Sequence, residues 1–357
     1  MRRLIYPKLV YRTLPTLLLC GWMLFASHSV TAQDPQFSQF YAAPLYLNPA
    51  FAGSTQQGRV GLNYRNQWPA IDANFTTVSA YADFYIEDKN SGVGAILTRD
   101  NVGIVGLQSI SFAAQYAYQL QITKDLSFRP GVQIGVVSRS INFGNLSFGD
   151  QFDPNTGEIV KGTAEALNTG QSKFFPDLSF GGLLFSKNAW LGFATHHITE
   201  PNQSILGAKD NLDMKLSIHG GYKFYFRPGS MGTGVFAKSQ ERSIAPVVQY
   251  RQQGKFSQAD IGMYYTAEPL VIGTWYRGIP FNQVNGFANN ESIVLLVGLV
   301  LKGEKDVLNI GYSYDYTISK LGPGSGGAHE FSIVYSWPTR NPRKPPKDKL
   351  IIPCPTF

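Results

Sequence analysis

The sequence predicts an all-β protein, a transmembrane antiparallel β-barrel of about fourteen strands. Its residues alternate between apolar and polar with a period of two, as in the segments 77–86, 109–120 and 308–316. Only 15% of residues are charged, 13% are aromatic, and no later segment is as long and apolar as a membrane-spanning helix. A soluble β-sandwich shares the alternation. Long strands, aromatic residues near strand ends, and short connections alternating with long ones favour the membrane barrel.

Residues 1–32 are typical of a secretory signal peptide. Four basic residues between Arg2 and Arg12 precede a short apolar core, and small residues stand just before Gln33, the expected mature start. The net charge of +7 includes these four residues, so the mature chain carries about +3. Weak charge and export argue against a nucleic-acid partner. Of two cysteines only Cys354 follows the signal, so no internal disulfide is expected.

The next segment, residues 33–57, is the part around which the chain is organised. Its three prolines oppose a long helix and a regular strand, yet it is too aromatic for a solvated linker. We therefore expect it to lie inside the barrel as a plug. The candidate plug residues are Asp34, Gln36, Phe37, Gln39, Phe40, Asn48, Pro49, Phe51 and Gly53.

Amphipathic segments follow over residues 58–337 and form the expected barrel. The predicted strands are 58–67, 74–86, 92–100, 107–121, 126–142, 176–186, 189–197, 213–226, 243–251, 256–265, 270–277, 290–302, 306–317 and 329–337.

The connections between these strands predict an orientation. Short turns follow the even-numbered strands and are expected to face the periplasm together with both termini. The longer loops follow odd-numbered strands and are expected outside; they are residues 143–175, 198–212, 278–289 and 318–328. Two connections break the rule, because 228–242 is too long and 252–255 is too short.

Charged residues on the polar strand faces are expected to point into the lumen. They are Asp83, Arg129, Lys215, Lys223, Arg251, Asp260, Asp315 and Glu330. Charges of this kind pair across a barrel interior and hold a plug, or they select a substrate; the first interpretation is preferred.

No pattern of a catalytic, cofactor or metal site stands out. His196 and His197 are adjacent in a strand, so they should face opposite sides, which opposes a shared metal. The glycine-rich stretch 322–327 lacks the strand-to-helix context of a nucleophile elbow, and phosphate-binding loops are missing. We expect a protein that is not an enzyme.

The chain ends in a tail, residues 338–357, with six prolines and five basic residues. This composition excludes a strand and predicts an extended periplasmic peptide. A partner-docking arm and a disordered end are both compatible with it.

Several motifs resemble the PorP/SprF family of type IX secretion outer-membrane proteins. They are the opening residues 34–40 and 48–53, and in the family's order 63–69, 250–254, 275–278 and 329–332. The resemblance covers the mature chain to Trp337. It implies an outer-membrane barrel of Bacteroidota, broadly similar to FadL-like transporters, which also carry an Asn-Pro-Ala element in an N-terminal plug.

The same resemblance implies a function. Family members assist the secretion or surface attachment of large proteins, including gliding adhesins, that carry a C-terminal sorting domain. The implied partners are outer-membrane lipid, that exported protein, other type IX components and a peptidoglycan-linked periplasmic lipoprotein. Motif and periodicity together suggest supports for the plug at Tyr64, Arg65, Trp68, Arg251 and Glu330. The alternatives are a FadL-like channel for small apolar ligands or nutrients, and a purely structural barrel.

Overall fold

A computed structural model describes most of the chain. The described residues are 34–72, 74–103, 106–141, 149–153, 156, 158–159, 172–205, 209–226, 241–284, 287–303, 306–339 and 350–355. The expected signal peptide, most of the long loops 143–175 and 228–242, and residues 340–349 of the tail lie outside them. Within the described part, no helix is long and apolar enough to cross a membrane.

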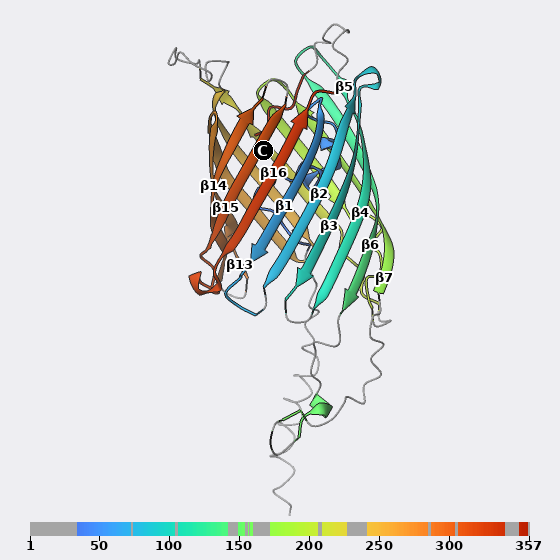
Figure 1. Cartoon of the computed structure of the whole chain (residues 1–357), viewed down its shortest axis with the longest axis vertical. Coiled ribbons are helices and arrows are strands. Elements are labelled where there is room, and N and C mark those ends of the chain that lie inside the picture. Colours follow the sequence, from blue (N-terminus) through green and yellow to red (C-terminus); the bar gives the residue numbers. More distant parts are fainter. Residues whose placement is uncertain are drawn as a thin grey trace, which may run out of the picture. The chain divides into compact units, whose positions relative to one another are not determined.

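The wall consists of antiparallel strands in sequence order (Figure 1). Their bounds are β1 Gly58–Gln67, β2 Phe75–Ile86, β3 Ser91–Val102, β4 Leu107–Tyr118, β5 Leu120–Gln121, β6 Ser127–Ile141, β7 Ser172–Phe185, β8 Ala189–His196, β9 Lys215–Tyr222, β10 Phe224–Tyr225, β11 Arg242–Gln253, β12 Phe256–Ala267, β13 Leu270–Val284, β14 Phe287–Lys302, β15 Val307–Thr317 and β16 Ala328–Trp337. The short pieces β5 and β10 prolong β4 and β9. The wall therefore has fourteen strands, and the predicted fold class is confirmed.

The sheet closes on itself. β1 pairs with β16 over its full length, from Gly58 opposite Trp337 to Gln67 opposite Ala328. Figure 1 shows this seam between the blue first strand and the red last strand. A closed barrel satisfies the backbone hydrogen bonds of its wall without an exposed edge, which is what a membrane requires.

Side chains alternate between an apolar outer face and a polar inner face. In β16, Phe331 and Ile333 are about half exposed, whereas Glu330 and Ser332 are buried. Leu62 and Asn63 of β1 show the same contrast. Since outward residues of a membrane barrel meet lipid, this alternation gives the described wall a lipid-facing surface.

The barrel has two distinct ends. We call the end with Gly58, Trp337 and the short turns the turn end, and the opposite one the loop end. The two-residue connection 254–255 lies at the loop end, where longer loops are expected. It is short, as the sequence predicted for this exception to the rule. The expected loop 278–289 is wrong: β13 and β14 continue to Val284 and from Phe287, with register shifts beside Gly278 and Ile279. These irregularities obscured the alternation in the sequence.

Candidate functional site

The candidate site is the barrel interior, filled by residues 35–57, which we call the lumen segment. Phe40, Tyr41, Leu45 and Phe51 are each at most 3% exposed. The segment contains one helical turn, α2 Pro44–Leu47, and a 3-10 turn, η1 Pro49–Phe51. Both turns begin with proline, which lacks an N–H and has its φ preset for a first helical position.

Asn48 joins the two turns and attaches them to the wall. Its Oδ1 accepts a hydrogen bond from the backbone N–H of Ala50 at 2.9 Å and so caps η1. Its Nδ2 donates to the carbonyl oxygens of Gly182 in β7 and Phe193 in β8, at 3.2 and 2.9 Å. One buried carboxamide thus orders the segment and binds two strands.

Two wall glycines allow this close approach. A Cβ on Gly181 would overlap the Asn48 carboxamide, and a Cβ on Gly131 would overlap the backbone of Pro49 and Ala50. The backbone of η1 therefore lies directly on β6 and β7. Larger residues at these positions would exclude it.

Near the loop end, wall carboxylates hold the start of the lumen segment. Glu330 accepts the backbone N–H groups of Ser38 and Gln39 at 2.6 and 3.0 Å, and Asp315 accepts the Ser38 hydroxyl at 2.6 Å. Arg65 bridges these acids, at 2.9 Å from Asp315 and 3.3 Å from Glu330. These side chains are nearly inaccessible, so the charge-assisted bonds form in a low-dielectric interior.

The charged cluster extends along the wall through Arg277. Its guanidinium contacts Asp260 and Asp315, each at 2.8 Å, and Asp260 also pairs with Arg251 at 3.0 Å. Glu291 adds a link to the lumen segment, because it accepts the Gln36 side-chain amide at 2.9 Å. Acidic and basic groups are thus mutually paired, as a buried charge cluster requires.

Nearer the turn end, a wall arginine and a wall carboxylate both bind the lumen segment. Arg129 of β6 donates to the carbonyl oxygens of Ala50, at 2.9 Å, and Ala52. Asp83 of β2 accepts the Gly53 N–H at 2.7 Å and is paired with Arg59 at 2.8 Å. Near the turn end arginines thus bind the segment's carbonyls and Asp83 binds one N–H, whereas at the loop end the backbone contacts are N–H groups bound by Glu330.

Aromatic rings fill the space between these polar ends. Tyr41 lies edge-on to Trp190, whose indole N–H donates to the Tyr41 hydroxyl at 2.7 Å. Phe40 packs against Trp275 and Tyr264 with ring centroids 5.8 and 6.5 Å away. Such buried rings add apolar contact area and favourable edge-to-face geometry.

Most candidate plug residues lie in this interior. Gln36, Gln39, Asn48 and Gly53 make the hydrogen bonds above or neighbouring ones, and Phe37, Phe40, Pro49 and Phe51 are buried. Asp34 falls in a separate unit, residues 1–34, which is not placed relative to the barrel. The role of these residues as a plug remains a prediction.

The candidate supports divide into three groups. Arg65 and Glu330 meet the lumen segment directly. Arg251 lies in the charged cluster and pairs with Asp260. Tyr64 is 39% exposed on the outer face, and Trp68 lies beyond the end of β1, where its ring packs on Phe75.

Sequence reasoning missed Ser38, Arg59, Arg277 and Glu291. Ser38 lies in the opening motif, and Arg59 and Arg277 lie on inward faces of their strands. The motif and the alternation of the sequence could therefore have identified these three residues. The expected opposite directions of His196 and His197 are also wrong, because both are buried; His197 leaves β8 with φ 57°. They contact Ser179 and Asp177 respectively, and the described residues contain no group of three metal-ligating side chains.

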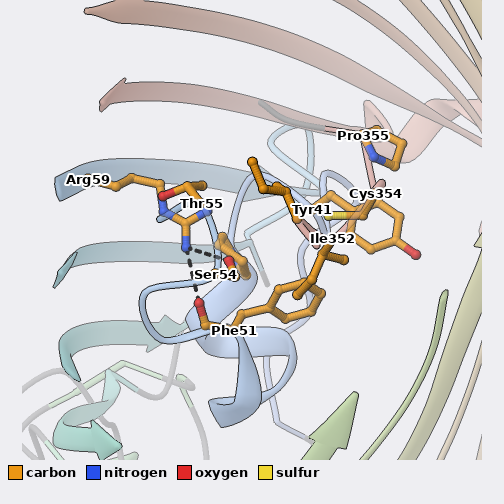
Figure 2. A pocket seen from close by; sticks show the side chains of 10 residues that line it. Tyr41, Phe51, Ser54, Thr55, Arg59, Ile352, Cys354 and Pro355 are labelled. Carbon is orange, nitrogen blue, oxygen red and sulfur yellow. Dashed lines mark hydrogen bonds between the residues drawn. The ribbon is translucent and has the colours of Figure 1, made fainter. Parts of the chain in front are cut away.

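The end of the tail, residues 350–355, contacts the lumen segment. This differs from the prediction that the tail extends freely into the periplasm. Ile352 is 5% exposed, and Ile352, Cys354 and Pro355 line one pocket with Tyr41, Phe51 and Arg59. Figure 2 shows Ile352 and Cys354 beside the Tyr41 and Phe51 side chains. The carbonyl oxygen of Leu350 accepts the side-chain amides of Gln56 and Gln119, each at 3.0 Å.

Comparison with known proteins identifies a family. A family profile described as "Type IX secretion system membrane protein PorP/SprF" matches residues 29–335. None of the curated proteins matches the sequence significantly.

The solved structures that resemble this chain share little sequence identity with it. A Pseudomonas aeruginosa FadL homologue is 11% identical, with 84% of this chain and 94% of that chain covered and a TM-score of 0.43. A ΔS2 mutant of the monoaromatic hydrocarbon channel TodX is 12% identical, with coverages of 84% and 94% and a TM-score of 0.45.

Proposed function

This chain belongs to the PorP/SprF family of type IX secretion membrane proteins, and we propose that it assists the secretion or surface attachment of a large exported protein. The family makes it an outer-membrane component of that system. The finer role is non-enzymatic: the barrel binds a secreted protein with a C-terminal sorting domain, such as an adhesin. Other type IX components and a peptidoglycan-linked lipoprotein are the further partners.

The observation that carries this proposal is the filled lumen. Wall groups that could line a solute path instead hold the lumen segment, because Glu330 and Arg129 bind its backbone. In turn, Asn48 of the lumen segment is hydrogen-bonded to two wall strands. A segment fixed by buried polar bonds at both ends is costly to remove, because every partner would be left unsatisfied. The lumen segment then acts as a plug, and partner binding falls to the loops and the tail.

The proposed orientation places the turn end in the periplasm and the loop end outside. Barrels of this class have short periplasmic turns and longer external loops. The longer connections at the loop end include residues 197–214 and 318–327, part of whose structure is described. These loops form the proposed face for the exported protein.

The test is fractionation of sorting-domain proteins in a strain that lacks this chain. Release of one adhesin into the medium is the result expected of an anchor, and its retention in the periplasm is that of a secretion component. Re-expression of the native chain should reverse either defect.

A matched conductance measurement separates this role from a channel. The purified native barrel in a planar lipid bilayer should conduct little, and Gly181→Ala, which crowds Asn48, should conduct more. Normal surface display in the deletion strain together with a high native conductance would contradict the proposal and favour a nutrient channel.

A further inference from the structure

We propose that the lumen segment carries a receptor site for an extended apolar peptide with proline, and that residues 350–355 are its displaceable resident. On the barrel side the site is formed by Tyr41, Pro44, Phe51, Ser54, Thr55 and Arg59, which line a small cavity together with the tail residues Ile351, Ile352, Cys354 and Pro355. It goes beyond the proposed function, because it concerns a peptide site inside the barrel and not the external loops.

The resident peptide is recognised mainly by its apolar side chains. Both isoleucines line the pocket, but Ile352 is 5% exposed whereas its neighbour Ile351 is 54% exposed, so Ile352 is the more deeply buried of the two. Pro353 and Pro355 are buried, and residues 350–355 form no helix or strand. A proline-containing extended peptide loses little conformational entropy when it binds in this way.

Few polar bonds fix the peptide. Among the described residues, the hydrogen bonds that the structure gives to this tail piece both end on the Leu350 carbonyl oxygen, from Gln56 and Gln119. Figure 2 shows no dashed line from Ile352, Cys354 or Pro355 to the residues around them. An occupant held by burial of Ile352, Pro353 and Pro355 and by hydrogen bonds to one carbonyl is replaceable by another peptide with the same features.

The site is formed independently of its occupant. Arg59 is held by Asp83 and also donates to the Phe51 carbonyl and the Ser54 hydroxyl, both at 3.4 Å. The Tyr41 hydroxyl accepts the Trp190 indole N–H. Because these partners belong to the wall and the lumen segment, departure of the tail leaves the site in place and exposes the Tyr41 and Phe51 rings.

The covalent link to the barrel favours binding of the tail peptide but does not make it permanent. Residues 338–349 link the peptide covalently to Trp337, and covalent linkage makes docking an intramolecular event with an effective concentration on the order of millimolar. A partner peptide at comparable concentration, or with higher affinity, therefore competes. Leu350–Pro355 is thus the template for the partner's chemistry: an apolar residue followed by proline, a small residue and proline.

Cys354 makes exchange measurable. It lies in the docked peptide, and it is the only cysteine when Cys20 is replaced by serine. The experiment measures alkylation of Cys354 by a maleimide in the purified, detergent-solubilised full chain, with and without the peptide Leu-Ile-Ile-Pro-Ser-Pro at millimolar concentration. Heat-modifiable migration on a gel verifies that the barrel is folded.

We expect slow alkylation of the native chain and an increase of at least fivefold when the peptide is added. Ile352→Asp should increase the rate at least tenfold without peptide, and Ile351→Asp, at a largely exposed side chain, should increase it much less. A peptide with aspartate in place of its second isoleucine should have no effect.

Two results would overturn the proposal. Native alkylation as fast as in urea would mean that the tail is not docked. Slow alkylation that Ile352→Asp accelerates but the peptide does not would mean that the tail is a fixed part of the fold. Neither result depends on secretion in cells, so failure here is distinguishable from failure of the proposed function.

Discussion

The lumen segment and the tail peptide are two stretches of proline-containing chain in the same interior, but they are held by different forces. The lumen segment is bonded along its length, through Ser38 and Gln39 at one end, Asn48 in the middle, and Gly53 near the other end. The tail peptide is held by apolar burial and by hydrogen bonds to one carbonyl. Buried polar bonds are costly to break, whereas apolar contacts are readily exchanged for similar ones.

This contrast implies that damage to the lumen segment should destabilise the barrel, while damage to the tail should change only its docking. The largest expected effect is at Arg65. Arg65→Met leaves Asp315 and Glu330 without this cation, and breaking a buried pair in this way costs about 3–5 kcal/mol. Urea unfolding in lipid vesicles, followed by tryptophan fluorescence, measures it.

Arg99→Met is the matched control, because Arg99 is exposed on the wall and should change the unfolding free energy little. Equal stability of the two variants would show that the charged cluster does not hold the lumen segment.

The next effect concerns the middle of the lumen segment. Asn48→Asp keeps the shape but removes both N–H donors and directs a carboxylate at the carbonyls of Gly182 and Phe193. The expected cost is about 3 kcal/mol in the same unfolding measurement. Asn211→Asp, on an exposed loop residue, should be neutral; a neutral Asn48→Asp would argue against the anchoring role.

A smaller loss is expected from the wall side of the same contact. Gly181→Ala introduces a Cβ that overlaps the Asn48 carboxamide, and overpacking of this kind costs about 1–3 kcal/mol. Gly324→Ala is the control, since its Cβ meets no atom within 4 Å. Similar unfolding midpoints for the two variants would mean that the wall adjusts freely.

The tail should respond differently. Ile352→Ala removes the buried side chain and should weaken docking by about 2 kcal/mol, roughly a thirtyfold rise in Cys354 alkylation. The unfolding midpoint of the barrel should stay unchanged, and Ile351→Ala, at a largely exposed side chain, should weaken docking much less than Ile352→Ala. A lowered midpoint would place the tail among the structural parts of the fold.

The smallest and most specific effect is on pH dependence. Burial raises the pKa of the Cys354 thiol to about 11, so docking favours the protonated form. The stability that this gives to docking is complete below the ordinary thiol pKa and is lost as pH rises toward about 11. In the docked chain, alkylation should rise about tenfold per pH unit up to that value, because the thiolate reacts. A plateau near the ordinary pKa would indicate an undocked thiol.

The period-two pattern predicted the wall almost completely. Each of the fourteen predicted strands overlaps a strand of the barrel, because lipid outside and polar groups inside impose alternation on every one of them. The same rule would have excluded Tyr64 as a lumen support: it is adjacent to the inward-facing Arg65 and so faces outward.

Local rules failed where the chain departs from regular strands. The bulged pairing beside Gly278 hid the continuation of β13 and β14, and the positive φ of His197 turned a side chain inward against the alternation. Neither departure has a pattern that can be read from neighbouring residues alone.

The sequence by itself determined the strand pattern, the two faces of the wall, and a proline-rich aromatic segment that had to be buried. The tertiary structure alone decided which partners meet. Arg65 contacts Asp315 and Glu330 across 250 and 265 positions of the chain, and Leu350 reaches Gln56 across 294. Such pairs follow from closure of the barrel, which brings the first and last strands together, and no local property of the chain encodes that distance.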